Sequence, residues 1–383
     1  MNRPKKKVNI PKKLKQKMNP NPFPRNRYTQ SAKLRKSPLK QKGSVHFKHH
    51  KLSYRLPVLL TFLSLLLLIL VIPSVIVLPF GKDKQEATVT REEPVVEDAG
   101  PEAISVAVMR DKSDTIEDVP LENYIIGVVA AEMSPDFDLE ALKAQALAAR
   151  TYTVSHLMGK SEESSYDITD TVQHQVYKND QELQDQWGSA YEKNIDKIRS
   201  AVEATKGEIL TYNDTPIMPA FFSMSNGYTE NSEDYWENEL PYLRSVESPW
   251  ELDNPKLLSQ ETFSAEELQT LLAVDLSQAA SNDMVIARKE SGRVDQLTIE
   301  GHTFTGREVR DKLGLRSSDF SVKQNKGHFT FTTKGFGHGI GMSQYGADGM
   351  AKEGKTYQEI VKYYYQGVEI SSLDETVPTL VSR

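Results

Sequence analysis

The chain contains no cysteine among its 383 residues. This absence excludes disulfide bonds, a thiolate nucleophile and any zinc site built from cysteine ligands. Acidic residues are also missing from the first 55 positions, which hold eighteen Lys or Arg, so the rest of the chain carries twenty-nine basic and fifty-three acidic side chains. The length is sufficient for one large or two ordinary domains, so an enclosed core and a cleft are both possible.

Charge is absent from residues 56–80, a run of twenty-five residues rich in Leu, Ile and Val. A run of this length can cross a bilayer as a helix. Its basic flank lies entirely on the N-terminal side, so we predict a single-pass anchor in the cell membrane, with a cytoplasmic N-terminus and the acidic bulk outside. A cleaved signal peptide is the alternative, but the apolar run is long and no small-x-small cleavage site follows it.

Composition divides the rest of the chain into four further parts. Residues 1–55 are predicted to be a disordered basic tail that meets the anionic inner leaflet, an interpretation we prefer to nucleic-acid binding. Residues 81–102 are predicted to be a linker, residues 103–370 the folded domain and residues 371–383 a C-terminal tail. The folded domain is expected outside the membrane.

Within the folded domain, helical and strand patterns mix without a regular βαβ repeat. We therefore predict an α+β domain, large enough for two lobes around a cleft. Strands are expected at 104–109, 115–119, 208–212, 217–225, 284–289, 294–299 and 328–333, and helices at 120–133, 139–157, 181–205, 263–272, 306–313 and 356–365.

Glu132 is the strongest candidate for a catalytic residue. It continues the apolar stripe that Tyr124, Val128 and Val129 form on a predicted helix, so its carboxyl is expected to be desolvated. Burial raises the pKa of a carboxyl, as a general acid working near neutral pH requires. The alternative is a buried glutamate that is neutralised by Lys143 or Arg150 on the next helix, and the residues alone do not decide between the two.

The following helix offers Lys143, Gln145 and Arg150 as donors to the hydroxyl, amide or carboxylate groups of a ligand, although charges on a helix are more often a solvated face. Ser225 and Thr229 are predicted to be hydrogen-bonding groups on the wall of a cleft. Ser225 is not predicted to be a nucleophile, because the sequence around it is not Gly-x-Ser-x-Gly.

Residues 335–347 have a glycine at every second position from Gly335 to Gly341. Glycine leaves room for a ligand or a second chain segment to lie against the backbone. We predict that His338, Ser343, Gln344 and Tyr345 line a groove for a polyol, with a structural role for His338 as the alternative. Replacing Gly339 with Val should then weaken ligand binding more than folding.

A metal site has only weak candidates in this sequence. His156 and His174 could combine with Asp167 or Asp170, but their spacing matches no known signature. We predict no metal. The alternating glycines also lack the context of a nucleotide-binding loop, so no cofactor is expected.

Several separate motifs, taken together, resemble the stage II sporulation protein D and amidase-enhancer family. The resemblance covers nearly all of residues 103–370. Its motifs are Ala-Ala-Glu132-Met, Lys143-Ala-Gln145, Arg150-Thr-Tyr152, Ser225-Asn-Gly-Tyr-Thr229, Leu-Pro-Tyr242-Leu and the glycine segment 335–347.

The resemblance implies a lytic transglycosylase that cleaves peptidoglycan glycan strands from which a partner amidase has removed the stem peptides, during engulfment in sporulation. Glu132 matches the family's catalytic glutamate, and Tyr242 joins Lys143, Gln145, Arg150 and Thr229 as positions implicated in activity. His338, Gln344 and Tyr345 match motif positions without a settled role.

The family also implies partners and a location. A sporulation cell-wall amidase and a membrane engulfment protein would be the protein partners, and the anchor would lie in the mother-cell membrane. Some relatives bind zinc through cysteines and histidines near the position of His174, but this chain has no thiol there. A hypothesis of another class is a non-catalytic protein that binds glycan and activates the amidase.

Overall fold

The computed structural model describes residues 104–160, 164–236, 238–275 and 284–381. In that part of the chain no helix is long and apolar enough to cross a membrane. The predicted span at 56–80, together with the predicted tail and linker, lies outside the described residues, so the anchor stays a prediction.

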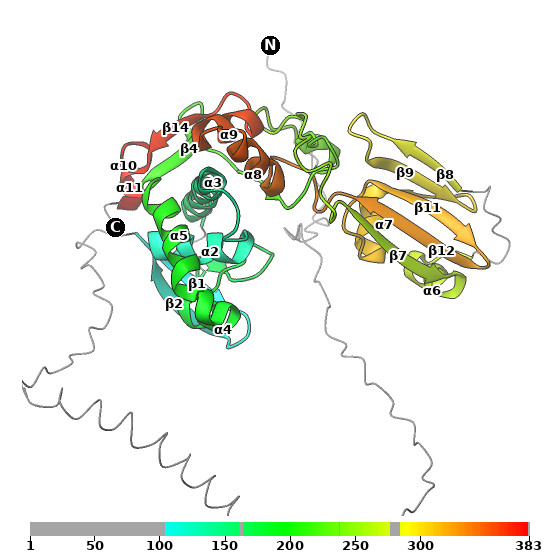
Figure 1. Cartoon of the computed structure of the whole chain (residues 1–383), viewed down its shortest axis with the longest axis horizontal. Helices are drawn as coiled ribbons and strands as arrows, with labels where there is room; N and C mark the ends of the chain where they lie inside the picture. The colour runs from blue at the N-terminus through cyan, green and yellow to red at the C-terminus, as the bar shows by residue number, and fades with distance from the viewer. Residues whose placement is uncertain (1–103, 161–163, 237, 276–283, 382–383) are drawn as a thin grey trace, which may run out of the picture. The chain divides into compact units, whose positions relative to one another are not determined.

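A long central helix organises the first hydrophobic core (Figure 1). This helix, α3 (Leu139–Met158), packs against α2 (Leu121–Glu132), α5 (Tyr191–Glu203), α8 (Gln344–Lys352) and α9 (Tyr357–Tyr364). Five alanines of α3 are fully buried, and their small side chains let neighbouring helices approach closely. The helix carrying the candidate acid is thus held against the centre of this core.

Small sheets flank these helices. Strand β1 pairs with β2 in the antiparallel and with β3 in the parallel sense, while β4 lies between β14 and β5. The bounds are β1 (Ser105–Arg110), β2 (Thr115–Pro120), β3 (Ile168–Thr169), β4 (Glu208–Tyr212), β5 (Thr215–Pro216) and β14 (Glu369–Ser372).

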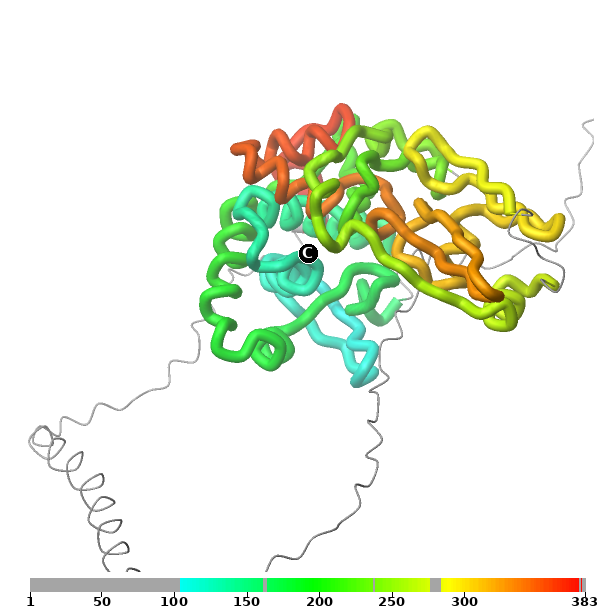
Figure 2. The backbone as a smooth tube through the Cα atoms, turned by 45° about the vertical axis from the view of Figure 1, so that its right-hand side comes forward, coloured from blue at the N-terminus to red at the C-terminus, as the bar shows by residue number. Residues whose placement is uncertain are grey.

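A second hydrophobic core is built from one continuous stretch of chain, which leaves the first core before β7 and returns after β12 (Figure 2). Leu258 pairs with Lys334 in the antiparallel ladder, so the two ends of this stretch lie side by side. Its elements are β7 (Leu258–Ser264), α6 (Ala265–Leu272), β8 (Met284–Arg288), β9 (Val294–Ile299), β10 (His302–Thr305), α7 (Gly306–Leu313), β11 (Phe320–Asn325) and β12 (His328–Lys334).

The chain after β12 crosses the first core's edge as the glycine segment. There β13 (Met342–Ser343) pairs in parallel with β6 (Phe221–Phe222), and α8 follows at once. The remaining short helices are α4 (Asp180–Trp187), η2 (Gly188–Ala190), η3 (Ser232–Asp234), α10 (Leu373–Thr376) and α11 (Pro378–Val381).

The mixed α/β class predicted from the sequence is confirmed, with several local differences. The predicted helix at 181–205 is broken at Gly188, whose φ of 53° ends α4. The predicted strand at 217–225 is reduced to β6, because the backbone there pairs only briefly. After β14, residues 373–381 form α10 and α11 and contribute Leu373, Val377 and Leu380 to the first core.

Candidate active site

Glu132 is the last residue of α2, and Met133 after it is extended, so the helix ends at the carboxyl-bearing position. The side chain is half-buried, and its Oε1 accepts a hydrogen bond from the Val176 backbone N–H at 3.1 Å. Desolvation raises the pKa of Glu132 to about 7, a rise that the Val176 hydrogen bond only partly offsets. The carboxyl can therefore hold a proton near neutral pH and also lose it, as a general acid and base must.

The alternative in which a cation neutralises Glu132 is wrong. Arg150 is fully buried and binds Glu122 through two hydrogen bonds of 2.9 and 2.7 Å. Lys143 binds Glu140 at 2.6 Å, one turn earlier on its own helix. Neither cation pairs with Glu132. Burial is therefore the main cause of the raised pKa of Glu132.

Arg150 ties four elements together. Besides Glu122 on α2, its guanidinium donates to the Val202 carbonyl on α5, to the Thr205 hydroxyl and to the carbonyl of Glu208 on β4. The guanidinium donates only to groups of the protein interior. Arg150, which the sequence analysis predicted to bind a ligand, therefore stabilises the packing of these elements.

Two tyrosines lie in the environment of Glu132. Tyr124 is fully buried and stacks on Tyr177 with ring centroids 5.1 Å apart. Burial raises the pKa of Tyr124 well above its usual range, and the charges of Tyr152 and Glu132 add to that shift. Burial also raises the pKa of Tyr152 to about 12. Both phenols are therefore neutral and can act only as hydrogen-bonding groups at physiological pH.

Residues 168–177 form the other side of this environment. The Nδ1 atom of His174 accepts hydrogen bonds from the N–H and the hydroxyl of Thr169, and burial lowers the pKa of His174 to about 4. Gln175 is buried, and its Oε1 accepts from the Thr153 hydroxyl at 3.1 Å. Its Nε2 has no hydrogen-bond partner among the described residues. Sequence reasoning missed Tyr124 and Gln175 as members of the site.

The histidine pair considered for a metal is used in packing. The rings of His156 and His174 meet edge to face at 4.7 Å, and His156 stacks on Tyr152. Within 104–381, outside the gaps at 161–163, 237 and 276–283, no group of three or more His, Asp or Glu could hold a metal ion.

Gln145 and Gln344 are brought together although 199 positions separate them. The Gln344 Nε2 donates to the Gln145 Oε1 at 3.4 Å, and both side chains are buried. The Gln145 Nε2 has no partner in the described part of the chain. Helix α8, which begins at Gln344, thus places an amide pair beside the helix that follows Glu132.

The loop after Glu132 is held from two sides. The Lys197 ammonium on α5 donates to the carbonyls of Pro135 and Phe137, at 2.9 and 2.5 Å. Tyr345 meets the Phe137 ring edge to face at 4.8 Å. These contacts fix the chain that leaves the catalytic candidate, and they place Tyr345 close to it.

Comparison with known proteins shows the family of this chain. The family model described as stage II sporulation protein matches residues 109–212. The chain is 46% identical over 345 residues to stage II sporulation protein D of Bacillus amyloliquefaciens, covering 85% of this chain and 99% of the relative. The chain belongs to the stage II sporulation protein D family. It is also 45% identical over 328 residues to stage II sporulation protein D of Bacillus subtilis (strain 168), covering 82% of this chain and 96% of that protein.

A more distant relative carries another name. The amidase enhancer of Bacillus subtilis (strain 168) is 30% identical over 304 residues, covering 64% of this chain and 40% of the relative. The segment matched by the family model includes Glu132, both tyrosines and the chain through Gln175. The surroundings of Glu132 therefore lie in the part of the chain by which this family is recognised.

The hydroxyls predicted to line a cleft or groove are buried and form hydrogen bonds with other groups of the protein. Ser225 and Ser343 are fully buried, and Glu251 accepts hydrogen bonds from the Ser225 N–H and the Ser343 hydroxyl. Thr229 is also fully buried, and its hydroxyl bridges the Arg244 carbonyl and the Val246 N–H. Their placement indicates a role in holding the loops together.

Two further predicted residues differ in accessibility. Tyr242 is half-buried, and its hydroxyl accepts from the Met218 N–H at 3.2 Å. His338 is buried, its Nδ1 accepts from the Ile340 N–H at 2.9 Å, and burial lowers its pKa to about 3. The structure thus favours the structural alternative for His338.

The alternating glycines lie against other parts of the same chain, two of them against backbone atoms and two against side chains. A Cβ on Gly341 would lie 2.0 Å from the Ala220 carbonyl oxygen, and one on Gly335 would lie 2.9 Å from that of Met224. All four glycines have positive φ, between 75° and 117°. The glycine pattern left room for either a ligand or a second chain segment to lie against this backbone. In the structure it is a second chain segment.

Proposed function

We propose that this chain is a membrane-anchored lytic transglycosylase that cleaves the bond between N-acetylmuramic acid and N-acetylglucosamine in glycan strands without stem peptides. The observation that carries the proposal is Glu132, a half-buried carboxyl whose pKa is about 7. No charged neighbour among the described residues contributes to that pKa. A single carboxyl of this kind suits a reaction in which the substrate supplies the nucleophile, in contrast to two-carboxylate hydrolysis.

The proposed reaction proceeds with one proton moving between Glu132 and the substrate. Protonated Glu132 donates to the glycosidic oxygen, and the bond from that oxygen to C1 of the muramic acid breaks. The carboxylate then accepts the proton of the C6 hydroxyl while O6 bonds to C1. The products are a free 4-hydroxyl and a 1,6-anhydro end, Glu132 is protonated again, and no water is consumed.

Neighbouring side chains supply orientation in this proposal. Tyr124, Tyr152 and Gln175 offer neutral polar groups around the carboxyl. Gln145 and Gln344 present a buried amide pair, and Tyr345 is partly accessible next to the loop that follows Glu132. The partly accessible phenols of Tyr152 and Tyr345 can bind the hydroxyl and acetamido groups of a sugar chain, whereas the buried amides and Tyr124 orient the groups around the carboxyl.

The biological setting is proposed from the relatives' names. They include stage II sporulation protein D and an amidase enhancer. We place this chain in engulfment during sporulation, with its catalytic domain outside the mother-cell membrane. A cell-wall amidase that removes stem peptides and a membrane engulfment protein would be its partners, and no metal or other cofactor is required by the reaction.

The decisive experiment uses the purified folded domain that is expected outside the membrane. It compares the wild type with the Glu132→Gln and Glu132→Ala variants on stem-peptide-free glycan strands. Mass spectrometry should detect anhydro-ended products with the wild type and a loss of at least about 100-fold with either variant. Glu192→Gln is the matched control, because Glu192 is exposed on α5. Equal product from wild type and both variants would exclude the proposed catalytic role.

A second candidate function is a non-catalytic activator of the amidase, which the likeness to an amidase enhancer favours. The same preparations should be added to a cell-wall amidase acting on intact peptidoglycan. Stimulation by wild type and Glu132→Gln alike, without anhydro products from either, would support the activator and contradict the transglycosylase.

A further inference from the structure

Gly127 lies in the middle of α2, although glycine is the least favourable residue inside a helix apart from proline. The structure gives a reason for its presence. A Cβ at this position would lie 2.4 Å from the Tyr177 Cε2 atom and 2.5 Å from the Lys178 carbonyl oxygen. Gly127 therefore lets a second stretch of chain lie directly on the helix that ends at Glu132.

This stretch, residues 174–178, is anchored to other elements through its side chains. The Nδ1 atom of His174 accepts from the Thr169 N–H at 3.1 Å and from the Thr169 hydroxyl at 2.8 Å, which ties it to β3. Gln175 binds the Thr153 hydroxyl of α3 at 3.1 Å. Two successive side chains thus attach residues 174–178 to two different elements.

Tyr177 attaches the same stretch to α2 and β1 through its ring. One contact is the stack on Tyr124, with ring centroids 5.1 Å apart, and the other is the Arg110 guanidinium, 4.9 Å from the ring centroid. The Tyr177 hydroxyl has no hydrogen-bond partner in the described part of the chain. The ring and not the hydroxyl therefore holds this residue in place.

The Val176 N–H lies between these anchors and donates to the Glu132 Oε1 atom at 3.1 Å. No other hydrogen bond reaches this carboxyl from the described residues, and its Oε2 atom is not enclosed. A hydrogen bond to the charged form of a carboxyl lowers its pKa, so this contact opposes the effect of burial on Glu132. The position of Val176 thus controls the orientation of the carboxyl and its affinity for the proton.

The titratable groups around Glu132 are neutral. Burial raises the pKa of each nearby phenol, those of Tyr124, Tyr152 and Tyr177. Burial also lowers the pKa of His174 to about 4. None of these side chains brings a charge to the carboxyl near neutral pH.

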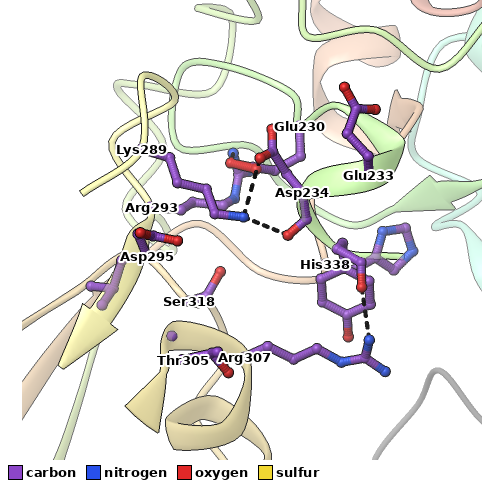
Figure 3. Close-up of a pocket in the computed structure, with 13 residues that line it drawn as sticks. Glu230, Glu233, Asp234, Lys289, Arg293, Asp295, Thr305, Arg307, Ser318 and His338 are labelled. Atoms are coloured by element: carbon purple, nitrogen blue, oxygen red, sulfur yellow. Dashed lines mark hydrogen bonds and ion pairs between the residues drawn. The ribbon is translucent and has the colours of Figure 1, made fainter. Parts of the chain in front are cut away.

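The charged groups of the surrounding elements bind other partners. Lys143 and Arg150 on α3 pair with other glutamates, and Lys197 on α5 donates to two loop carbonyls. A charged pocket of about 350 Å³ at the second core includes no residue of α2 or α3, and its Arg293 pairs with Glu230 (Figure 3). The backbone N–H is therefore the polar contact that acts on the catalytic candidate.

We infer that residues 174–178 position Glu132, with Gly127 providing the surface on which they lie and Tyr177 the ring that holds them there. They keep the Val176 N–H on Oε1 and leave Oε2 free to transfer the proton. These are positioning residues, since they act through Glu132 and need not touch the substrate. The inference rests on the proposed role of Glu132 as the acid.

The contact is tested in the wild type by NMR of the purified folded domain, a measurement that does not require cleavage. The Val176 amide proton should move downfield as the pH rises, with the same midpoint near pH 7 as the Glu132 carboxyl carbon. The movement should be absent in Glu132→Gln. A Val176 amide that does not titrate would overturn the inference. A titrating amide without anhydro-ended products would support the contact and contradict the proposed function.

Two variants should displace the stretch: Gly127→Ala, whose Cβ meets the Tyr177 ring, and Tyr177→Ala, which removes that ring. Each should raise the NMR midpoint of Glu132 by about one pH unit, because the lost hydrogen bond favours the carboxylate. The pH above which kcat/KM falls should rise by the same amount.

Tyr177→Phe keeps the ring and should restore the wild-type midpoint. Gly159→Ala controls for an added methyl group, because a Cβ there comes no closer than 3.7 Å to the nearest atom. Thermal unfolding shows which variants are folded. An unchanged midpoint in folded Gly127→Ala or Tyr177→Ala, or a midpoint raised equally by Tyr177→Phe, would overturn the inference.

Discussion

At the scale of single residues, the burial of Glu132 sets the expected pH dependence of the proposed reaction. The acid form must be present, and the pKa of Glu132 is about 7. We predict that kcat/KM on stem-peptide-free glycan is highest below pH 7 and falls about tenfold per pH unit well above it. The measurement is a rate profile from pH 5 to 9 by chromatography of anhydro-ended products. A profile that stays flat to pH 9 would contradict Glu132 as the general acid.

The same burial predicts an effect on stability. The folded state raises the pKa of Glu132 from 4.5 to about 7, so this group stabilises the fold most below about pH 4.5 and progressively less as the pH rises to 7. Glu132→Gln removes the cost of the buried charge. The variant should be more stable than wild type at pH 8, by up to about 3 kcal/mol, and nearly equal at pH 4.

Urea unfolding at the two pH values measures this difference. Glu192→Gln again serves as the control, because an exposed glutamate should show no pH-dependent gain. If Glu132→Gln changed the free energy of unfolding equally at pH 4 and pH 8, the pKa of Glu132 would not be raised by the fold.

Arg150 shows what residue spacing could not predict. Its position on a helix face suggested that Arg150 donates hydrogen bonds to a ligand. Its actual hydrogen-bond acceptors, including Glu122 and Thr205, are distant from it in the sequence. We predict that Arg150→Met lowers the free energy of unfolding by about 3 to 5 kcal/mol, because a buried ion pair is broken. Arg199→Met should cost less than about 1 kcal/mol, since the Arg199–Asp196 pair is exposed. Lost activity with unchanged stability in Arg150→Met would restore the ligand-binding interpretation.

At the scale of elements, local patterns predicted most helices because an apolar stripe and a cap lie within one stretch of sequence. The helix of residues 306–313 is an example: Thr305 and Glu308 form its capping box, and Gly314 ends it. Elements fixed by distant partners were missed, as with β11, which exists through its pairing with β12. Glu132 could be found from the apolar stripe on its own helix. Gln175 could not, because its position beside Glu132 depends on the tertiary fold and not on a pattern in the adjacent sequence.

The glycine segment provides a prediction about an element. Gly341→Ala should lower the free energy of unfolding by about 3 kcal/mol or more, because it adds a Cβ against the Ala220 carbonyl at a φ of 75°. Gly314→Ala is the matched control: its φ is 65°, but a Cβ there meets nothing within 4 Å. The control should cost only about 1 kcal/mol.

Thermal unfolding of the two variants separates close packing from backbone strain. Equal losses would show that positive φ alone explains the glycines. Gly339→Val combines a strained φ of 93° with a Cβ that would lie 2.6 Å from the Arg293 guanidinium, which is buried and cannot move freely. The structure therefore predicts a loss of folding for Gly339→Val, in place of the selective loss of ligand binding that the sequence pattern suggested.

At the scale of the whole molecule, the described chain contains two hydrophobic cores, which differ in how their residues are distributed along the sequence. The first combines segments from both ends of the described chain, whereas the second comes from one continuous stretch. Sequence patterns gave the individual helices but not this division, because pairing between residues such as Leu258 and Lys334 depends on the complete fold. The family-model match at 109–212 lies entirely outside the second core.

This organisation predicts that the second core can be removed. Because Leu258 and Lys334 are paired neighbours, a short Gly-Ser linker can replace residues 258–334 without stretching the first core. The deletion exposes or unpairs Glu230, which is 2% exposed and binds Arg293 and Ser291, so it should be combined with Glu230→Gln. We expect the shortened protein to fold and to retain cleavage that depends on Glu132.

Circular dichroism and product analysis by mass spectrometry distinguish the outcomes of the deletion. Loss of cleavage in a folded, shortened protein would mean that the second core contributes to holding the glycan. A protein that fails to fold with Glu230→Gln but folds when residues 258–334 are supplied as a separate chain would show that the two cores stabilise each other. Retained cleavage at a raised KM would assign the second core to substrate affinity, since kcat reports the chemistry around Glu132 and KM the binding of the strand when dissociation is fast.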